Sequence, residues 1–303
     1  MMLLLFAQTS WTYVAGGAIL LIGIMSLLQQ RPFAGGVAES LINLGPLFLA
    51  VPMAVFAGDH FVFTRFMVNM IPNWIPWHVF WLVFVGVCLL AGALALATRR
   101  CAALAAALFG IMLLLFEVLL HIPGAVKAQN NRFLWTIVAR EFTFASGALA
   151  FAATAIASAR PRLASAVITG ARIVIGVAIT FFGIENLLHP EFRPAVPLKG
   201  LAPTWIPGHL AWSYVTGVAF VAGGLLLLMN VRTRAVATWL GGLVLLLVMV
   251  VYLPIMVTRF ADIGDGLNYF ADTLMLSGSL LCFAGSQPAE PGVTISTLRP
   301  AVR

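Results

Sequence analysis

Nine apolar stretches, each long enough to cross a bilayer, constrain this chain more than any other feature of its sequence. Each has roughly 18 to 25 residues, about the length of a helix that spans the hydrocarbon core. The stretches are 11–28, 40–59, 78–98, 102–122, 133–158, 166–188, 209–229, 235–256 and 268–286. A backbone in hydrocarbon must satisfy its own hydrogen bonds, so such stretches form helices. The sequence therefore predicts an all-α, polytopic transmembrane protein of about nine helices.

The composition agrees with a chain that is surrounded by a lipid bilayer. Hydrophobic residues make up 62% of the 303 positions and charged residues 9%, whereas soluble domains carry about a quarter charged residues. The net charge of +7 would favour a nucleic-acid partner in a soluble domain. Here the basic residues lie in loops between apolar stretches, where they set the topology. We therefore expect lipid, and no nucleic acid, as the partner.

The basic residues are divided unevenly between alternate loops. One side of the predicted membrane has Arg31, Arg99, Arg100, Arg160, Arg162, Arg232, Arg234, Arg299 and Arg303. The other side has Arg65, Lys127, Arg132, Arg193, Lys199 and Arg259, spread over longer loops. Because short cytoplasmic loops carry the excess of arginine and lysine, the N-terminus is predicted to lie outside and the C-terminus in the cytoplasm.

A degenerate internal repeat organises the chain. Residues 72–149 recur 131 positions later as residues 203–280, and residues 56–60 match residues 182–186 at an offset of 126. The pairs include Pro72 with Pro203, Trp74 with Trp205, Pro76 with Pro207, His78 with His209, and Glu141 with Asp272. The loop before Trp205 has thus gained five residues. Each copy holds an even number of apolar stretches, so the two copies are predicted to be parallel in the membrane.

The repeat predicts four segments. They are an extra N-terminal transmembrane helix at 1–35, a first four-helix repeat at 36–160, a second at 161–287, and a polar cytoplasmic tail at 288–303. The first stretch is interpreted as a retained helix rather than a signal peptide, because residues 1–10 contain no basic residue. No soluble domain is expected.

Ionisable side chains inside apolar stretches are costly in hydrocarbon and therefore mark candidate functional residues. The first repeat places such groups at one similar depth: Asp59, His60, His78, Glu117, His121 and Glu141. We predict a site in the outer half of the first bundle, where Glu141, Glu117, His60 and His121 bind a head group or relay protons. The predicted cofactor-binding residues are Asp59, His78, Trp74, Asp272, Glu185 and His209.

The two copies differ in their titratable groups. His60, Glu117 and His121 of the first copy correspond to Asn186, Val248 and Tyr252 of the second. A metal or haem ligand set shared by both copies is therefore disfavoured, and no metal site is predicted. Glu117 and His121 are four residues apart, a spacing that places both on one face of an α-helix.

The three cysteines are isolated from one another. None of Cys88, Cys101 and Cys282 forms a C-x-x-C pair, so the sequence gives no support for a dithiol relay. They are interpreted as small apolar side chains.

Two short motifs resemble those of the DoxX-like family of small bacterial membrane proteins. They are FAGDHF at 56–61 and IPNWIPWH at 71–78, and a second, weaker instance follows at Glu185-Asn186 and at 203–207. The resemblance implies a four-helix transmembrane unit, present here as a tandem duplication in a bacterial inner membrane. It also implies a loose association with quinone-linked redox chemistry. Asn186 stands where the family motif has histidine, so the second copy departs from the pattern.

Three functions remain open from the sequence. The first is a redox or quinone-linked membrane subunit, with a quinone as candidate cofactor and a membrane or periplasmic redox protein as candidate partner. The second is a binding or transport module for a small lipophilic molecule, at the interface between the two bundles. The third is a membrane scaffold without chemistry of its own. The sequence does not name a substrate.

Overall fold

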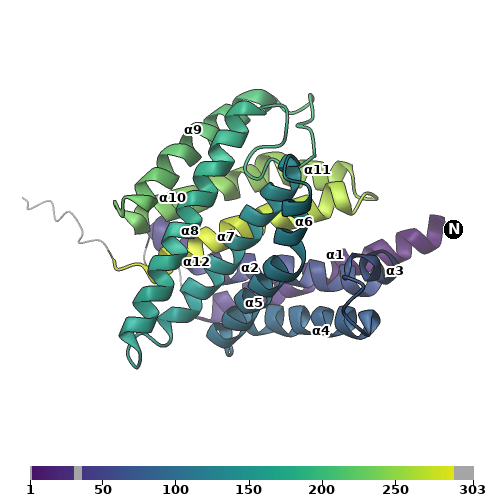
Figure 1. The fold of residues 1–303 in the computed structure, drawn as a ribbon, viewed down its shortest axis with the longest axis horizontal. Helices are drawn as coiled ribbons and strands as arrows, with labels where there is room; N and C mark the ends of the chain where they lie inside the picture. Colours follow the sequence, from purple (N-terminus) through teal and green to yellow (C-terminus); the bar gives the residue numbers. More distant parts are fainter. Residues whose placement is uncertain (1, 31–35, 290–303) are drawn as a thin grey trace, which may run out of the picture.

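The computed structural model describes residues 2–30 and 36–289, and these residues form helices without a β-strand (Figure 1). The helices are α1 (Met2–Gln30), α2 (Gly36–Val62), α3 (Thr64–Met67), α4 (His78–Ala97), α5 (Ala102–Phe116), α6 (Ile122–Lys127), α7 (Arg132–Thr154), α8 (Pro161–Leu188), α9 (His209–Leu228), α10 (Thr233–Leu247), α11 (Leu253–Thr258) and α12 (Tyr269–Ser286). Short 3-10 or π-helical segments are η2 (Val68–Met70), η3 (Glu117–His121), η4 (Val248–Tyr252) and η5 (Gly264–Asn268). The predicted all-α fold is confirmed. Most of the predicted tail lies outside the described residues.

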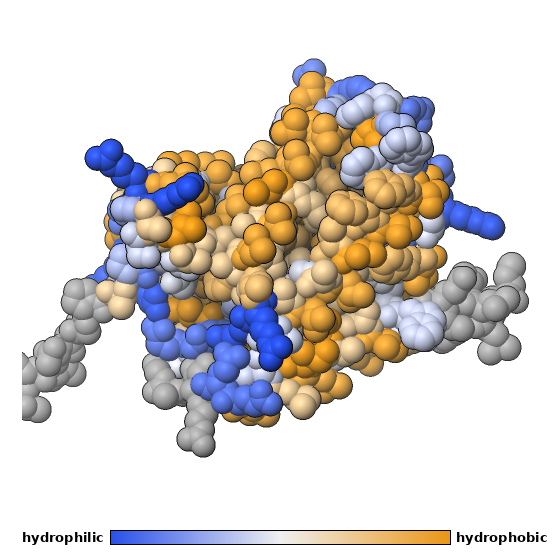
Figure 2. Space-filling model, turned by 90° about the horizontal axis from the view of Figure 1, so that it is seen from below, coloured by the Kyte–Doolittle hydropathy of each residue, from blue (hydrophilic) through white to orange (hydrophobic). Residues whose placement is uncertain are grey.

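Eight of the described helical stretches are long and apolar enough to cross a membrane. They are Ser10–Gln30, Gly36–Val62, His78–Ala97, Ala102–Lys127, Pro161–Leu188, His209–Leu228, Thr233–Thr258 and Gly264–Ser286. Helix α7, the remaining predicted span, has 23 residues but contains Arg132, Arg140 and Glu141, which lower its hydropathy. Figure 2 shows hydrophobic side chains over most of one face, with hydrophilic side chains toward its margins. A surface of this kind suits contact with lipid.

Two of the spanning stretches change from α- to π-helix at positions 131 residues apart. The π segments η3 and η4 begin at Glu117 and at Val248, and Pro123 and Pro254 follow them near the start of α6 and α11. Proline has no N–H for the carbonyl of the preceding turn, and its ring collides with that carbonyl. A widened π turn accommodates this defect inside a helix that otherwise continues.

The turns before α4 and α9 also share their geometry. Trp77 and Gly208 directly precede these helices and have φ angles of 58° and 65°, in the left-handed region. Glycine adopts this conformation freely, whereas a tryptophan there is strained. The same turn is therefore built at both positions despite the different side chains.

The helices of the two predicted repeats pack across each other. Helix α2 packs against α4, and α8 against α9, but α2 also packs against α12, and α7 packs against both α8 and α12. The last helix of each predicted repeat thus lies between the two halves. The sequence predicts two four-helix bundles. In the structure, the helices do not separate into two such bundles, because α2 packs against α12 and α7 packs against α8. Helix α1 lies outside this arrangement, against α2 and α4.

Helices α7 and α12 approach each other closely where they cross, because Gly147 has no side chain at this point. A Cβ atom added to Gly147 would lie 2.5 Å from the Cα and backbone oxygen of Ser279. Small residues allow such contact between membrane helices, which gain their association energy from van der Waals packing. Gly147 therefore sets the distance between the two halves at their centre.

Candidate functional site

A cavity of about 910 Å³ lies where α2, α5, α7 and α12 meet. We call it the acidic pocket, because Asp59, Glu141 and Asp272 line it together with His60 and His121. Its other walls are largely apolar and aromatic, with Phe109, Met112, Phe116, Phe144 and Met275 among them. Apolar walls with a few convergent polar groups are typical of sites for small molecules.

The end of α2 brings Asp59 and His60 into this pocket. Both side chains are buried, because α2 is enclosed by its neighbouring helices. The Nδ1–H of His60 donates to the Phe56 carbonyl oxygen at 2.7 Å, so Nε2 remains for another partner. Asn268 lies beside Asp59, while the Oδ1 atom of Asp59 has no hydrogen-bond partner in the described part of the chain.

Arg140 joins the two halves at the floor of the pocket. Its Nη1 donates to Asp272 Oδ2 at 2.6 Å, and its Nη2 donates to Glu141 Oε1 at 2.7 Å. The three side chains are 11–14% exposed. Glu141 belongs to α7 and Asp272 to α12, so one guanidinium holds two acids from helices that are far apart in the sequence. Charge-assisted hydrogen bonds of this kind are among the strongest in proteins.

Glu117 is the most deeply buried acid near the pocket. It is 0% exposed, and neither carboxyl oxygen has a hydrogen-bond partner in the described residues. It lies close enough to interact with the charges of Glu141 and Arg140. His121 also interacts with these two charges and lines the pocket, whereas Glu117 does not line it.

The prediction that Glu117 and His121 share one helix face assumed α-helical geometry. The structure corrects that geometry, because residues 117–121 form a π-helical segment with i→i+5 hydrogen bonding. Both side chains still lie toward Glu141 and Arg140, but Glu117 is enclosed whereas His121 reaches the pocket.

Three carboxyl groups thus lie near the guanidinium of Arg140: Glu117, Glu141 and Asp272. Asp59 lies close enough to Asp272 to interact with its charge. An excess of buried negative charge is costly unless protons or a positive or hydrogen-donating group accompany it. The arrangement can therefore take up protons, or bind a molecule that donates hydrogen bonds.

Four of the predicted residues lie elsewhere. Trp74 is 67% exposed, and His78 at the start of α4 has its Nε2 3.2 Å from the Pro72 carbonyl oxygen within the local turn. His209 begins α9 and does not line the acidic pocket. Glu185 accepts a hydrogen bond from Arg132 at 3.0 Å on the α8 side. The pocket is also not confined to residues 36–160, because α12 supplies part of its wall.

Sequence reasoning missed several residues at the site. Asn268 and Met275 come from η5 and α12, and only the packing of α12 against α2 brings them near Asp59. Arg193 was counted only as a loop charge, yet it is 1% exposed. Arg193 lies in the loop between α8 and α9, which is five residues longer than its counterpart before Trp74. That difference in length indicated a different structure for this loop, but the prediction did not use it.

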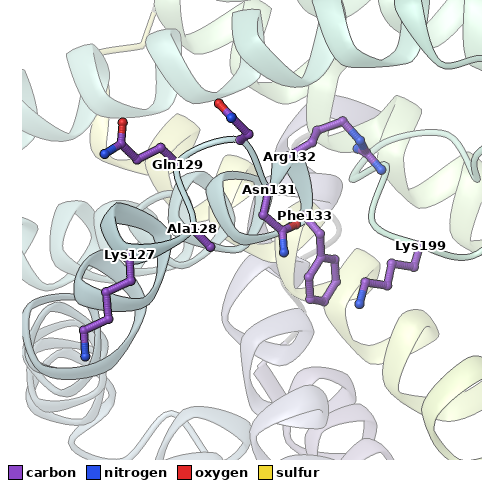
Figure 3. A pocket seen from close by; sticks show the side chains of 8 residues that line it. Lys127, Ala128, Gln129, Asn131, Arg132, Phe133 and Lys199 are labelled. Carbon is purple, nitrogen blue, oxygen red and sulfur yellow. The ribbon is translucent and has the colours of Figure 1, made fainter.

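A shallower surface hollow lies between the turn from α6 to α7 and the loop that carries Lys199 (Figure 3). Its lining includes Lys127, Arg132 and Phe133. The ammonium of Lys199 lies 4.1 Å from the centre of the Phe133 ring, a cation–π contact. This hollow is polar and open, and the predicted acids and histidines do not line it.

The fold and the site define a class of protein. Spanning apolar helices that enclose buried ionisable groups are those of a polytopic integral membrane protein. Among the described residues, no three histidine, cysteine, aspartate or glutamate side chains are grouped so that they could hold a metal ion. Comparison of the chain with protein-family models, curated proteins and solved structures finds no match.

Proposed function

We propose that this protein binds a small lipophilic molecule with an oxygen-bearing head group in the acidic pocket. The observation that carries the proposal is the cavity itself, which joins apolar and aromatic walls to buried acids and imidazoles among membrane-spanning helices. Lipophilic molecules concentrate in the surrounding bilayer. The apolar walls would take the body of the molecule, and the polar end would orient its head.

The polar groups favour a head group that exchanges protons. The free Nε2 of His60 accepts from a hydroxyl when the imidazole is neutral and donates to a carbonyl when it is protonated. Asp59 lines the cavity, and its Oδ1 atom has no hydrogen-bond partner among the described residues, so it would accept from a donor on the head group. Glu117 and Glu141 would store or relay protons beside Arg140. A quinone presents carbonyl groups and its quinol presents hydroxyl groups. The quinone therefore fits the protonated imidazole of His60, and the quinol fits the neutral one.

We therefore propose a quinone-linked role as the first specific function. Reduction of a quinone to a quinol consumes two electrons and two protons. The electrons would come from a membrane or periplasmic redox protein, and the protons would pass through Glu117, Glu141 and His121. In this proposal His60 and Asp59 hold the head group.

The proposed setting is a bacterial inner membrane, with the N-terminus in the periplasm and the C-terminus in the cytoplasm. The DoxX-like motifs at 56–61 and 71–78 support this setting and the tandem duplication. The π segments at 117–121 and 248–252, and the left-handed turns at Trp77 and Gly208, also support the duplication, because each pair is 131 residues apart.

The direct test is to measure ligand binding by protein purified in mild detergent. Co-purified small molecules are identified by mass spectrometry, and a decyl benzoquinone is titrated as the probe. Met112→Trp would fill the pocket and is expected to weaken binding at least tenfold. The matched control is Leu243→Trp, at the position 131 residues later, outside the pocket lining. Equal binding by both variants would contradict the proposed location.

The identity of the bound molecule separates the three functions. A bound quinone supports the redox role, and a different lipid in the same pocket supports a binding or transport module. A preparation that neither retains a lipophilic molecule nor binds the probe would leave a scaffold and overturn the proposal.

A further inference from the structure

A short segment of the chain is buried inside the second half of the molecule. Residues 193–198, which we call the plug, belong to the loop that joins α8 to α9 (Figure 1), and all six are buried. A backbone bridge between Phe192 and Leu201 closes the base of this loop. Ala195 has a φ of 83°, a strained conformation for a residue with a Cβ atom that persists where the surroundings impose it.

Donor groups on the surrounding helices bind the carbonyl oxygens of the plug. Asn186 Nδ2 on α8 donates to Ala195 O at 3.0 Å, and Tyr252 Oη at the end of η4 donates to Pro194 O at 2.6 Å. Arg132 at the start of α7 donates to Pro197 O and Leu198 O. Figure 3 shows Arg132 extending toward the loop that carries Lys199.

Arg193 fixes the first residue of the plug from another direction. Its guanidinium donates to the Asp265 carboxylate at 2.8 Å and lies 4.8 Å from the centre of the Tyr269 ring. The Tyr269 hydroxyl accepts from the N–H of Gly200 at 2.9 Å. Helices α7, α8 and α12, with segments η4 and η5, therefore surround the plug.

The residues that hold the plug correspond to the residues that line the acidic pocket. His60 Nδ1 bonds the Phe56 carbonyl, and Asn186 Nδ2 bonds the Phe182 carbonyl, in each case four residues back. The surrounding helices correspond as well, because α12 packs against α2 as α7 packs against α8.

The second pair of residues corresponds in the same way. His121 and Tyr252 each end a π segment and stand two residues before a proline. His121 reaches the acidic pocket, and Tyr252 reaches the plug. The acidic pocket thus occupies the place in the first half that the plug occupies in the second.

Within residues 2–30 and 36–289, no loop of the first half fills the corresponding place. Its connection from His60 to Pro72 is five residues shorter than the connection from Asn186 to Pro203. It folds into α3 and η2, which contribute Phe66 and other side chains to the pocket lining. These side chains line the cavity of about 910 Å³.

We infer that the ligand of the acidic pocket takes the place of the plug and presents acceptor oxygens to His121 and to the Nε2–H of protonated His60, as the plug presents carbonyl oxygens to Asn186 and Tyr252. The inference rests on the proposed function and specifies the ligand. The ligand is an elongated lipophilic molecule with two carbonyl-type oxygens toward one end. Quinones and diacyl lipids share this chemistry.

The test transfers the donors of the second half into the first. The double variant His60→Asn with His121→Tyr carries the two donors that bind the plug, whereas His60→Ala with His121→Phe carries none. Decyl benzoquinone is titrated into each purified protein. We expect the Asn/Tyr variant to retain the wild-type Kd within about threefold, and the Ala/Phe variant to lose at least tenfold in affinity. Equal losses in the two variants would overturn the inference.

A second measurement uses the wild-type protein, so it tests the same inference even if one of the double variants does not fold. Infrared spectra of the probe labelled with ¹³C at its carbonyls are compared free and bound. Hydrogen bonding to two donors should lower the carbonyl stretching frequency of bound probe, and an unshifted band would overturn the inference. Titration with a short-chain diacyl lipid distinguishes a lipid from a quinone as the source of the carbonyls. Absence of binding by both probes to wild-type protein would instead overturn the proposed function.

Discussion

Replacing Arg140 by methionine should destabilise the protein strongly, because it leaves two acids without their shared cation. Arg140 is 14% exposed on its side chain and donates to both Glu141 and Asp272. Removal of one partner from a buried ion pair costs about 3 to 5 kcal/mol. Methionine keeps most of the length and apolar bulk of the side chain, so the loss reports mainly the charge.

The same reasoning predicts that removal of all three charges restores much of the stability. The triple variant Arg140→Met, Glu141→Gln, Asp272→Asn removes the cation together with the two acids that it binds directly, and neutral replacements of buried ion pairs are often tolerated. The control is Arg259→Met. Arg259 is 52% exposed, and its partner Asp265 keeps Arg193. An exposed pair of this kind contributes only about 0 to 1 kcal/mol.

The assay is equilibrium unfolding in mixed micelles of mild detergent and sodium dodecyl sulfate, followed by circular dichroism. The expected order of stability is wild type close to Arg259→Met, then the triple variant, then Arg140→Met. If Arg140→Met lost less than about 1 kcal/mol, or if the triple variant were as unstable as the single one, the cluster would not be the buried, mutually dependent network described here.

Three further predictions concern packing, the plug and orientation. Gly147→Val should destabilise by about 1 to 3 kcal/mol in the same unfolding assay, since its Cβ would meet the backbone of α12; Gly170→Val, with nothing within 4 Å of its Cβ, should cost much less. Tyr252→Phe should destabilise by about 1 to 3 kcal/mol, because it leaves a buried carbonyl oxygen of the plug without its donor, and an unchanged stability would contradict that role. A phosphatase reporter fused near Lys127 should be active and one fused after Arg234 inactive, and the reverse pattern would overturn the proposed orientation.

The helices could be predicted from the sequence because the bilayer leaves few alternatives. The stretch expected at 209–229 is helix α9 at His209–Leu228, and the stretch at 268–286 is close to α12 at Tyr269–Ser286. Length and hydropathy suffice here, since an isolated apolar stretch in lipid must form a helix. The apolar periodicity is too uniform to say which helices pack together, so the contacts of α12 with α2 and of α7 with α8 were not predicted.

The candidate site was predicted in part for the same reason. Buried charges are rare in hydrocarbon, so Asp59, His60, Glu141 and Asp272 were identified by their chemistry alone, and the structure brings them to one cavity. Trp74 and His209 were predicted because they belong to the repeated motif. That motif specifies the turn before a helix and does not specify a contact with the acidic pocket. The plug could not be predicted, because its place depends on side chains from four separate parts of the chain.

The position of α12 has a consequence for the synthesis of the protein. Helices enter a membrane in the order of the chain, starting from the N-terminus. Helix α2 is therefore made long before α12, the neighbour that covers it and supplies Asp272 to Arg140. Until α12 arrives, the acids of the first half face a gap that only lipid, water or another protein can fill. The pocket is completed by the last described helix, so a nascent chain that stalls before residue 269 has every earlier helix and no finished binding site.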